Sequence, residues 1–111
     1  MKFKIQSFLS FFVVLAASHI SMAQTIKPGE IWPDNNGVHI NAHGGGMLFF
    51  EGKYYWFGEH KIEGKAGNKA QVGVHCYSSD DLYKWKDEGI ALAVSEDPES
   101  PIIKGCIIER P

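Results

Sequence analysis

The sequence predicts an all-β fold built from four short antiparallel strands. Apolar and polar residues alternate with a period of two, and aromatic and β-branched runs are separated by turns rich in Gly, Asn and Asp. No segment keeps a helical period. Four strands in about 40 to 50 residues form the repeat unit of a β-propeller blade. A β-sandwich has similar short strands and stays an alternative.

The first 23 of the 111 residues are typical of a secretory signal peptide. Lys2 and Lys4 precede an apolar stretch, Phe8–Ala17, and the small residues Ser21 and Ala23 mark a cleavage site after Ala23. The longest unbroken apolar run has 7 residues, whereas a membrane span needs roughly 20. We expect a secreted or periplasmic protein that leaves the membrane after cleavage. A buried N-terminal helix is the alternative.

Charge and cysteine content exclude several classes of protein. The formal net charge is −2; without the two lysines of the first 23 residues, 9 basic residues face 13 acidic ones and the charge becomes −4. Such a chain has no basic surface for a nucleic acid. Cys76 and Cys106 are too few for a disulfide scaffold, and they either pair or stay free thiols.

The segment before the glycine run is predicted to change from loop to strand. Turn-forming residues are dense over 24–37, which indicates an extended lead-in. Val38–His43 alternates as a strand does, with His39, Asn41 and His43 on one side. The three glycines that follow allow a sharp bend or a close approach to a ligand.

Two aromatic runs then predict a β-hairpin. Met47–Phe50 and Lys53–Phe57 are separated by the turn pair Glu51-Gly52. Their nearly continuous apolar character predicts a sheet that is covered on both faces.

The second half of the sheet follows a polar loop. Gln71–Tyr77 and Gly89–Val94 are the third and fourth predicted strands, and Trp85 is expected to fill the corner between them. Residues 95–101 form a linker, after which a new apolar segment begins.

Two acidic residues differ from the others, which lie in turns. Glu59 ends an aromatic strand, and Glu109 follows an apolar segment. A carboxylate at the end of a buried strand is costly unless it is paired or functional. The structural alternatives are ion pairs of Glu59 with Lys61 and of Glu109 with Arg110.

Histidines and aromatic residues are the other candidates. His39 and His43 have the spacing of a metal pair only on a helix, and no acid or cysteine completes a set, so no metal site is predicted. A histidine beside a glycine-rich bend suits hydrogen bonding to a hydroxylated ligand. The aromatic side chains are core residues or stack on sugar rings.

Three stretches of the sequence resemble glycoside hydrolase family 43. They are Asn-Ala-His-Gly-Gly-Gly at 41–46 with Tyr-Tyr-Trp-Phe-Gly-Glu-His-Lys at 54–61, and Tyr-Ser-Ser-Asp-Asp-Leu-Tyr-Lys-Trp at 77–85. The branch that the chain is similar to contains the exo-acting galactan 1,3-β-galactosidases. The resemblance covers about residues 30–111.

This resemblance implies the first blade of a five-bladed propeller. The expected organisation is a signal peptide (1–23), a lead-in (24–37), the first blade (38–94), and a linker with the start of the second blade (95–111), where the chain is truncated. The family implies an inverting mechanism, in which a general acid protonates the leaving oxygen and a water attacks the opposite face.

Four residues are our candidates for the central pocket. Asn41 and His43 would bind sugar hydroxyls and Glu59 would contact substrate, while the resemblance implies that Glu109 contacts substrate or tunes the pKa of the general acid. No aspartate stands where the family usually has its base, so the base is unassigned, and the acid would lie beyond residue 111. Some members hold calcium, but no ligand set for it is visible, and no other cofactor is expected.

We therefore expect the N-terminal fragment of a secreted exo-glycosidase that acts on the oligo- or polysaccharide chains of β-1,3-galactan or arabinogalactan. The fragment itself is expected to be inactive. The alternatives are a non-catalytic carbohydrate-binding module and an arabinofuranosidase or β-xylosidase of the same fold family.

Overall fold

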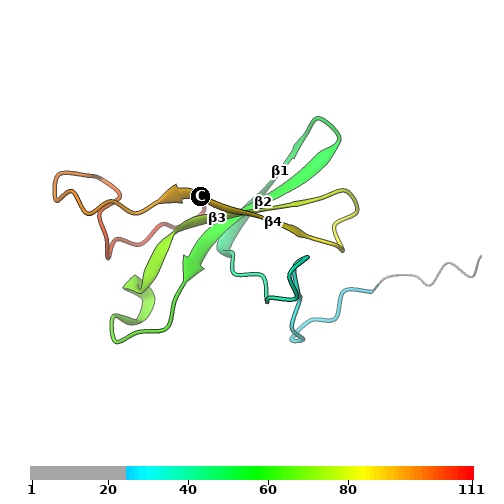
Figure 1. The fold of residues 1–111 in the computed structure, drawn as a ribbon, viewed down its shortest axis with the longest axis horizontal. Helices are drawn as coiled ribbons and strands as arrows, with labels where there is room; N and C mark the ends of the chain where they lie inside the picture. Colours follow the sequence, from blue (N-terminus) through cyan, green and yellow to red (C-terminus); the bar gives the residue numbers. More distant parts are fainter. Residues whose placement is uncertain (1–24) are drawn as a thin grey trace, which may run out of the picture.

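The computed structural model describes residues 25–111, so the predicted signal peptide lies outside the described part of the chain. That part contains one four-stranded antiparallel sheet with the strand order β1-β2-β3-β4 (Figure 1). The strands are β1 (His43–Phe50), β2 (Lys53–Lys61), β3 (Gln71–Ser79) and β4 (Lys86–Ala93). A short 3₁₀ helix, η1 (Gly67–Lys69), lies between β2 and β3. The predicted all-β class is confirmed.

The predicted hairpin connects β1 to β2. Phe50 pairs with Lys53 across a two-residue loop, in which Glu51 and Gly52 have φ angles of 49° and 80°. Two successive positive φ angles give a turn whose twist matches that of the flanking strands. The hairpin prediction is confirmed.

The strand predicted over Val38–His43 is wrong for all but its last residue. Ile40 donates its backbone N–H to Trp32 at 2.9 Å, and Asp34 donates to Val38 at 2.8 Å, so this stretch pairs with the lead-in. The sheet begins only at His43, and the glycines that follow lie inside β1. The pairing of β1 with β2 is irregular between His43 and Gly46.

All three tryptophans of the sequence pack together on one face of the sheet. Trp56 lies 5.3 Å from Trp85 and 5.8 Å from Trp32 between ring centroids. Trp85 and Tyr77 are each 2% exposed, and Ile40 completes the buried cluster. The expectation that Trp85 fills the corner of the sheet is confirmed, and the cluster also fixes the lead-in against the sheet.

The central strand β3 is buried on both faces, whereas the outer strands β1 and β4 are largely exposed within residues 25–111. Every residue of β1 is exposed, including Met47, Leu48, Phe49 and Phe50, each at least half exposed. The prediction of a sheet covered on both faces is therefore not met by the described residues. Cys76 is buried and Cys106 half-buried, and both are free thiols.

The chain returns to the sheet after β4 (orange to red in Figure 1). Ser95 donates its N–H to Ile102 and accepts one from Lys104, at 2.9 and 2.8 Å, which closes a loop. The Gln71 side-chain amide then donates to the Cys106 carbonyl at 3.0 Å. The last residues are thereby held beside the ends of β2 and β3.

A substitution at Gly58 tests the close approach of Ala42 to β2. A Cβ on Gly58 would overlap with backbone atoms of Ala42, which cannot move without disturbing the tryptophan cluster. We expect Gly58→Ala in the full-length gene product to lower stability by about 1–3 kcal/mol, the usual cost of overpacking. The measurement is the thermal midpoint. Gly64→Ala is the control, because its Cβ would meet only Ala70 at an ordinary 3.5 Å; an equal loss in both variants would contradict the prediction.

Candidate functional site

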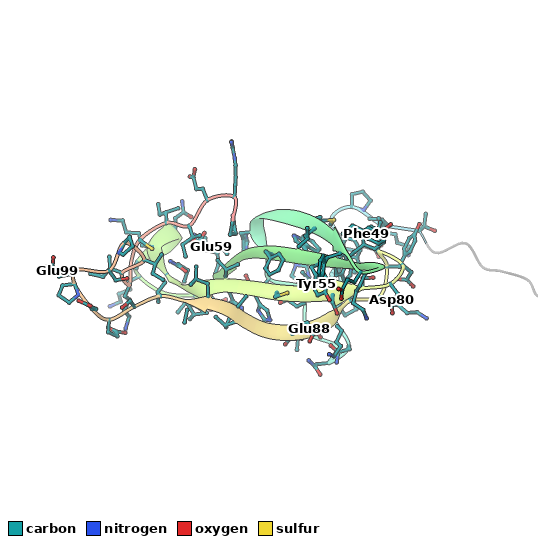
Figure 2. All side chains as sticks on the ribbon, turned by 90° about the horizontal axis from the view of Figure 1, so that it is seen from above. Phe49, Tyr55, Glu59, Asp80, Glu88 and Glu99 are labelled. Carbon is teal, nitrogen blue, oxygen red and sulfur yellow. The ribbon has the colours of Figure 1, made fainter. Side chains whose placement is uncertain are left out.

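The carboxylate of Glu59 is buried near the end of β2. Glu59 is only 4% exposed, and its Oε2 atom lies 2.5 Å from the Lys61 ammonium. Its Oε1 atom accepts a hydrogen bond from the backbone N–H of Ile108 at 3.1 Å. A buried carboxylate is tolerated only when charged or hydrogen-bonding partners replace its water. The partners here come from its own strand and from the C-terminal segment, which passes over Glu59 in Figure 2.

Lys61 shares a strand face with Glu59, because residues two apart in a strand point to the same side. Its ammonium contacts the carbonyl oxygen of Asn68 as well as the carboxylate of Glu59. The Lys61 side chain is 21% exposed. This is the ion pair that the sequence left open as the alternative for Glu59.

Glu59 and Lys61 line a cavity of about 420 Å³, which we call the Glu59 hollow. It lies where the start of β1, the end of β2 and the C-terminal segment meet. Gly44 has a φ angle of +61°, a conformation that favours glycine, and the chain turns there beside Arg110. The lining residues are His43, Gly44, Glu59, Lys61, Asn68, Ile107, Ile108, Glu109 and Arg110.

Three of the four candidate residues from the sequence therefore lie together. His43, Glu59 and Glu109 all line the Glu59 hollow, although Glu109 is 50 residues from Glu59 in the chain. No ion pair joins Glu109 to Arg110 among the described residues, so the predicted structural alternative for Glu109 is not seen.

The fourth candidate, Asn41, lies next to the hollow but is not one of its lining residues. Its side-chain Oδ1 accepts the backbone N–H of Lys61 at 2.9 Å, and its Nδ2 donates to the Lys61 carbonyl at 2.6 Å. The Asn41 backbone N–H donates to the Tyr77 hydroxyl at 3.1 Å. Asn41 thus joins the buried core to the end of β2.

Sequence reasoning missed Lys61, Asn68 and Arg110 as lining residues. Lys61 had a usable signal, because it alternates with Glu59 along one strand. Asn68 and Arg110 had none, since a loop and a C-terminal segment bring them to the hollow. Among residues 25–111, no three His, Cys, Asp or Glu side chains lie close enough together to hold a metal ion.

A second group of polar side chains was also missed. On the face of the sheet that carries the tryptophans, His75 Nε2 lies 2.5 Å from an Asp87 carboxylate oxygen, and His75 Nδ1 lies 2.7 Å from His60 Nδ1. The Tyr77 hydroxyl lies 3.2 Å from the same His75 nitrogen. A short Nδ1–Nδ1 contact needs a proton on one ring and a lone pair on the other. The hydrogen bond between the two rings is therefore lost when both imidazoles carry a proton on each nitrogen.

The surroundings shift the pKa values of this group. The pKa of His60 lies below its ordinary 6.5. Burial is the larger cause, and the charge of the neighbouring His75 is the next. The hydrogen bond from His75 holds the pKa of Asp87 below its ordinary 3.8. Burial raises the pKa of Tyr77. The network is thus arranged around a neutral His60 and a charged Asp87.

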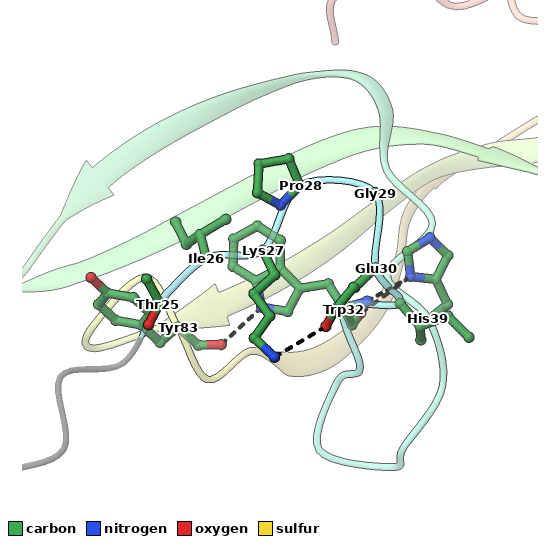
Figure 3. Close-up of a pocket in the computed structure, with 10 residues that line it drawn as sticks. Thr25, Ile26, Lys27, Pro28, Gly29, Glu30, Trp32, His39 and Tyr83 are labelled. Atoms are coloured by element: carbon green, nitrogen blue, oxygen red, sulfur yellow. Dashed lines mark hydrogen bonds and ion pairs between the residues drawn. The ribbon is translucent and has the colours of Figure 1, made fainter.

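A second cavity, of about 520 Å³, lies under the lead-in (Figure 3). Trp32 and Tyr83 form part of its wall, and the Trp32 indole N–H donates to the Tyr83 carbonyl at 3.0 Å. Lys27 and Glu30 form an exposed ion pair at its rim. This cavity contains no buried carboxylate, which distinguishes it from the Glu59 hollow.

Comparison with solved structures gives the family. No protein-family model and no curated protein matches the chain. A family 43 β-1,3-galactosidase solved with galactodeoxynojirimycin is 59% identical, with a TM-score of 0.67, over 77% of this chain and 24% of that one. The chain belongs to glycoside hydrolase family 43.

Two exo-β-1,3-galactanases are also similar. The one from Clostridium thermocellum is 39% identical, with a TM-score of 0.56, over 67% of this chain and 15% of its own. The one from Phanerochaete chrysosporium, solved with galactose, is 34% identical, with a TM-score of 0.65, over 78% of this chain and 19% of its own. The family 43 chain described here thus spans about a quarter or less of the length of these proteins.

The lowered pKa of His60 predicts a pH-dependent stability. Because the folded state disfavours the charged ring, the unfolded chain binds more protons than the folded one below pH 6.5. The contribution of neutral His60 to the free energy of unfolding is therefore complete above pH 6.5. It is lost as the pH falls through the pKa of His60 in the folded state. In NMR titrations of the ring carbons of the full-length gene product, we expect His60 to titrate below 6.5. His60→Gln should remove this part of the dependence of the thermal midpoint on pH. Titration of His60 at or above 6.5 would contradict the prediction.

Proposed function

We propose that this chain is part of a secreted glycoside hydrolase that releases galactose from the end of β-1,3-galactan. The observation that carries the proposal is the Glu59 hollow, where His43, Glu59 and Glu109 meet in a chain that is 59% identical to a β-1,3-galactosidase. The neighbours named above are galactosidases or galactanases, which favours galactose over arabinofuranose or xylose as the released sugar.

The residues of the hollow suit a sugar with several hydroxyl groups. The Glu59 carboxylate accepts hydrogen bonds and is held rigid by Lys61 and Ile108. His43 lies at the start of β1 and can donate or accept. A galactose hydroxyl both donates and accepts hydrogen bonds, so a galactose site needs acceptors as well as donors. Glu59 is committed to an ion pair, and we assign it to binding the sugar and not to proton transfer.

We assign Glu109 to act on the general acid. It lines the hollow at the C-terminal segment, and its negative charge would raise the pKa of a carboxyl group placed near it. A carboxyl group with a raised pKa stays protonated and donates its proton to the leaving oxygen, while a water attacks the opposite face of the sugar. We assign the general acid to a residue outside 25–111.

Hydrolysis of β-1,3-galactan by the full-length gene product tests this function. We expect free galactose that forms first as the α anomer, as inversion of a β-linkage requires, and that is seen by proton NMR. Glu109→Gln should lower kcat/KM by about 10- to 100-fold, because it removes a charge that contacts substrate and tunes the acid. Glu99→Gln is the control, at the exposed tip of the loop after β4 (Figure 2).

The same assay separates the alternatives. Residues 24–111 alone should release no galactose, because they lack the acid. Binding of galactan without release by the full-length product would favour a carbohydrate-binding module, for which the aromatic wall of the lead-in cavity offers a surface. Release of arabinose or xylose in place of galactose would contradict the proposed substrate.

The proposed location follows from the substrate and the N-terminal sequence. Galactan is a polymer that does not cross a membrane, and residues 1–23 are typical of a signal peptide. Among residues 25–111 there is no α-helical stretch with the length and apolar character for crossing a bilayer. We expect the mature protein outside the cytoplasm with Gln24 as its first residue, which mass spectrometry of the N-terminal peptide would show. An intact Met1 on the active protein would contradict it.

A further inference from the structure

We propose that Lys61 contacts the sugar in the Glu59 hollow through the third N–H of its ammonium group, and that Asn41 is the residue that positions it. This inference rests on the proposed function, because it names a further contact in the same hollow. In the sequence, Lys61 was expected only as an ion-pair partner of Glu59.

The backbone of Lys61 is fixed on two sides. The Asn41 amide accepts from the Lys61 N–H and donates to the Lys61 carbonyl, at 2.9 and 2.6 Å. Asn41 is itself held by the Tyr77 hydroxyl, which is part of the buried core. On one side Lys61 pairs with Gln71 of β3, but on the other side β1 pairs with β2 only as far as Glu59. Asn41 takes the place of a neighbouring strand there.

The side chain of Lys61 is fixed as well, but one donor is left over. An ammonium group has three N–H donors. One is directed to Glu59 and one to the Asn68 carbonyl. The third has no acceptor among the described residues, and the side chain lines the hollow with 21% of its surface exposed. A ligand atom in the hollow that accepts a hydrogen bond would complete the group.

The charges around Lys61 indicate which acceptor fits. The Glu59 carboxylate, at 2.5 Å, already balances the positive charge of Lys61. Glu109 and Arg110 also line the hollow, and their opposite charges leave its lining without a net charge that would favour an ionic ligand. A neutral hydroxyl oxygen satisfies the third N–H without adding charge. The Glu59–Lys61 pair then offers a carboxylate acceptor and an ammonium donor side by side, an arrangement that suits two neighbouring hydroxyl groups of one sugar ring.

Binding of galactose and of its mono-deoxy derivatives to the full-length gene product tests the proposal. Among these derivatives, the one that lacks the hydroxyl group bound by Lys61 should bind the unaltered protein about 10- to 100-fold more weakly than galactose in calorimetry. This is the expected effect of losing a hydrogen bond to a charged group. Lys61→Met should weaken galactose binding by a similar factor and bind that deoxygalactose and galactose equally well. A merely structural role would weaken both sugars and keep the difference between them.

Three further variants complete the experiment. Asn41→Ala should also reduce the difference between the two sugars, because Lys61 is no longer held in place. Lys61→Arg keeps a charged donor beside Glu59 and should recover part of the discrimination; it replaces Lys61→Met if the latter fails to fold. Lys65→Met, in the exposed loop before β3, is the matched control and should change nothing.

The outcomes separate this proposal from the proposed function. If the unaltered protein binds no galactose, both are contradicted. If it binds galactose and Lys61→Met discriminates against the same deoxygalactose as the unaltered protein does, the role of Lys61 is overturned and the proposed function stands.

Discussion

The packing of three tryptophans against one another is the contact on which the rest of the structure depends. Trp32 comes from the lead-in, Trp56 from β2, and Trp85 from the corner before β4, and their ring centroids are 5.3 to 6.3 Å apart. Large aromatic side chains contribute most of the apolar area that a small sheet can bury. The cluster thereby attaches an irregular segment to a sheet, and it brings Ala42 and Asn41 against the end of β2.

A buried charge depends on that attachment. Asn41 holds the backbone of Lys61, and Lys61 balances the carboxylate of Glu59. Because Glu59 is buried, loss of Lys61 would leave its negative charge uncompensated. The positions of Asn41, Lys61 and Glu59 are therefore coupled. The Ile108 N–H donates a hydrogen bond to the same Glu59 carboxylate, so the C-terminal segment also depends on this charge. The hollow is therefore a polar structure that is organised by an apolar cluster on the other face of the sheet.

The two faces of the sheet have different roles. One is covered by the lead-in and contains the tryptophans and the His60–His75–Asp87 network. The other carries Glu59 and leaves much of β1 exposed. The polar network lies among side chains whose partners come from β2, β3 and β4, so every one of its hydrogen bonds depends on correct strand register. The contacts of His60, His75 and Asp87 therefore depend on the pairing of β2, β3 and β4.

Local sequence determined the class of fold, the hairpin at Glu51-Gly52, and the residue types of the hollow. These depend on alternation, turn geometry and the cost of a buried carboxylate, all of which act over a few residues. Tertiary structure decided that Val38–Ile40 pairs with the lead-in, that the Asn41 side-chain amide forms hydrogen bonds with Lys61, and that His60 contacts His75. Such contacts join residues 4 to 20 positions apart. Alternation along one strand does not specify which other segment will satisfy a given backbone or side-chain group.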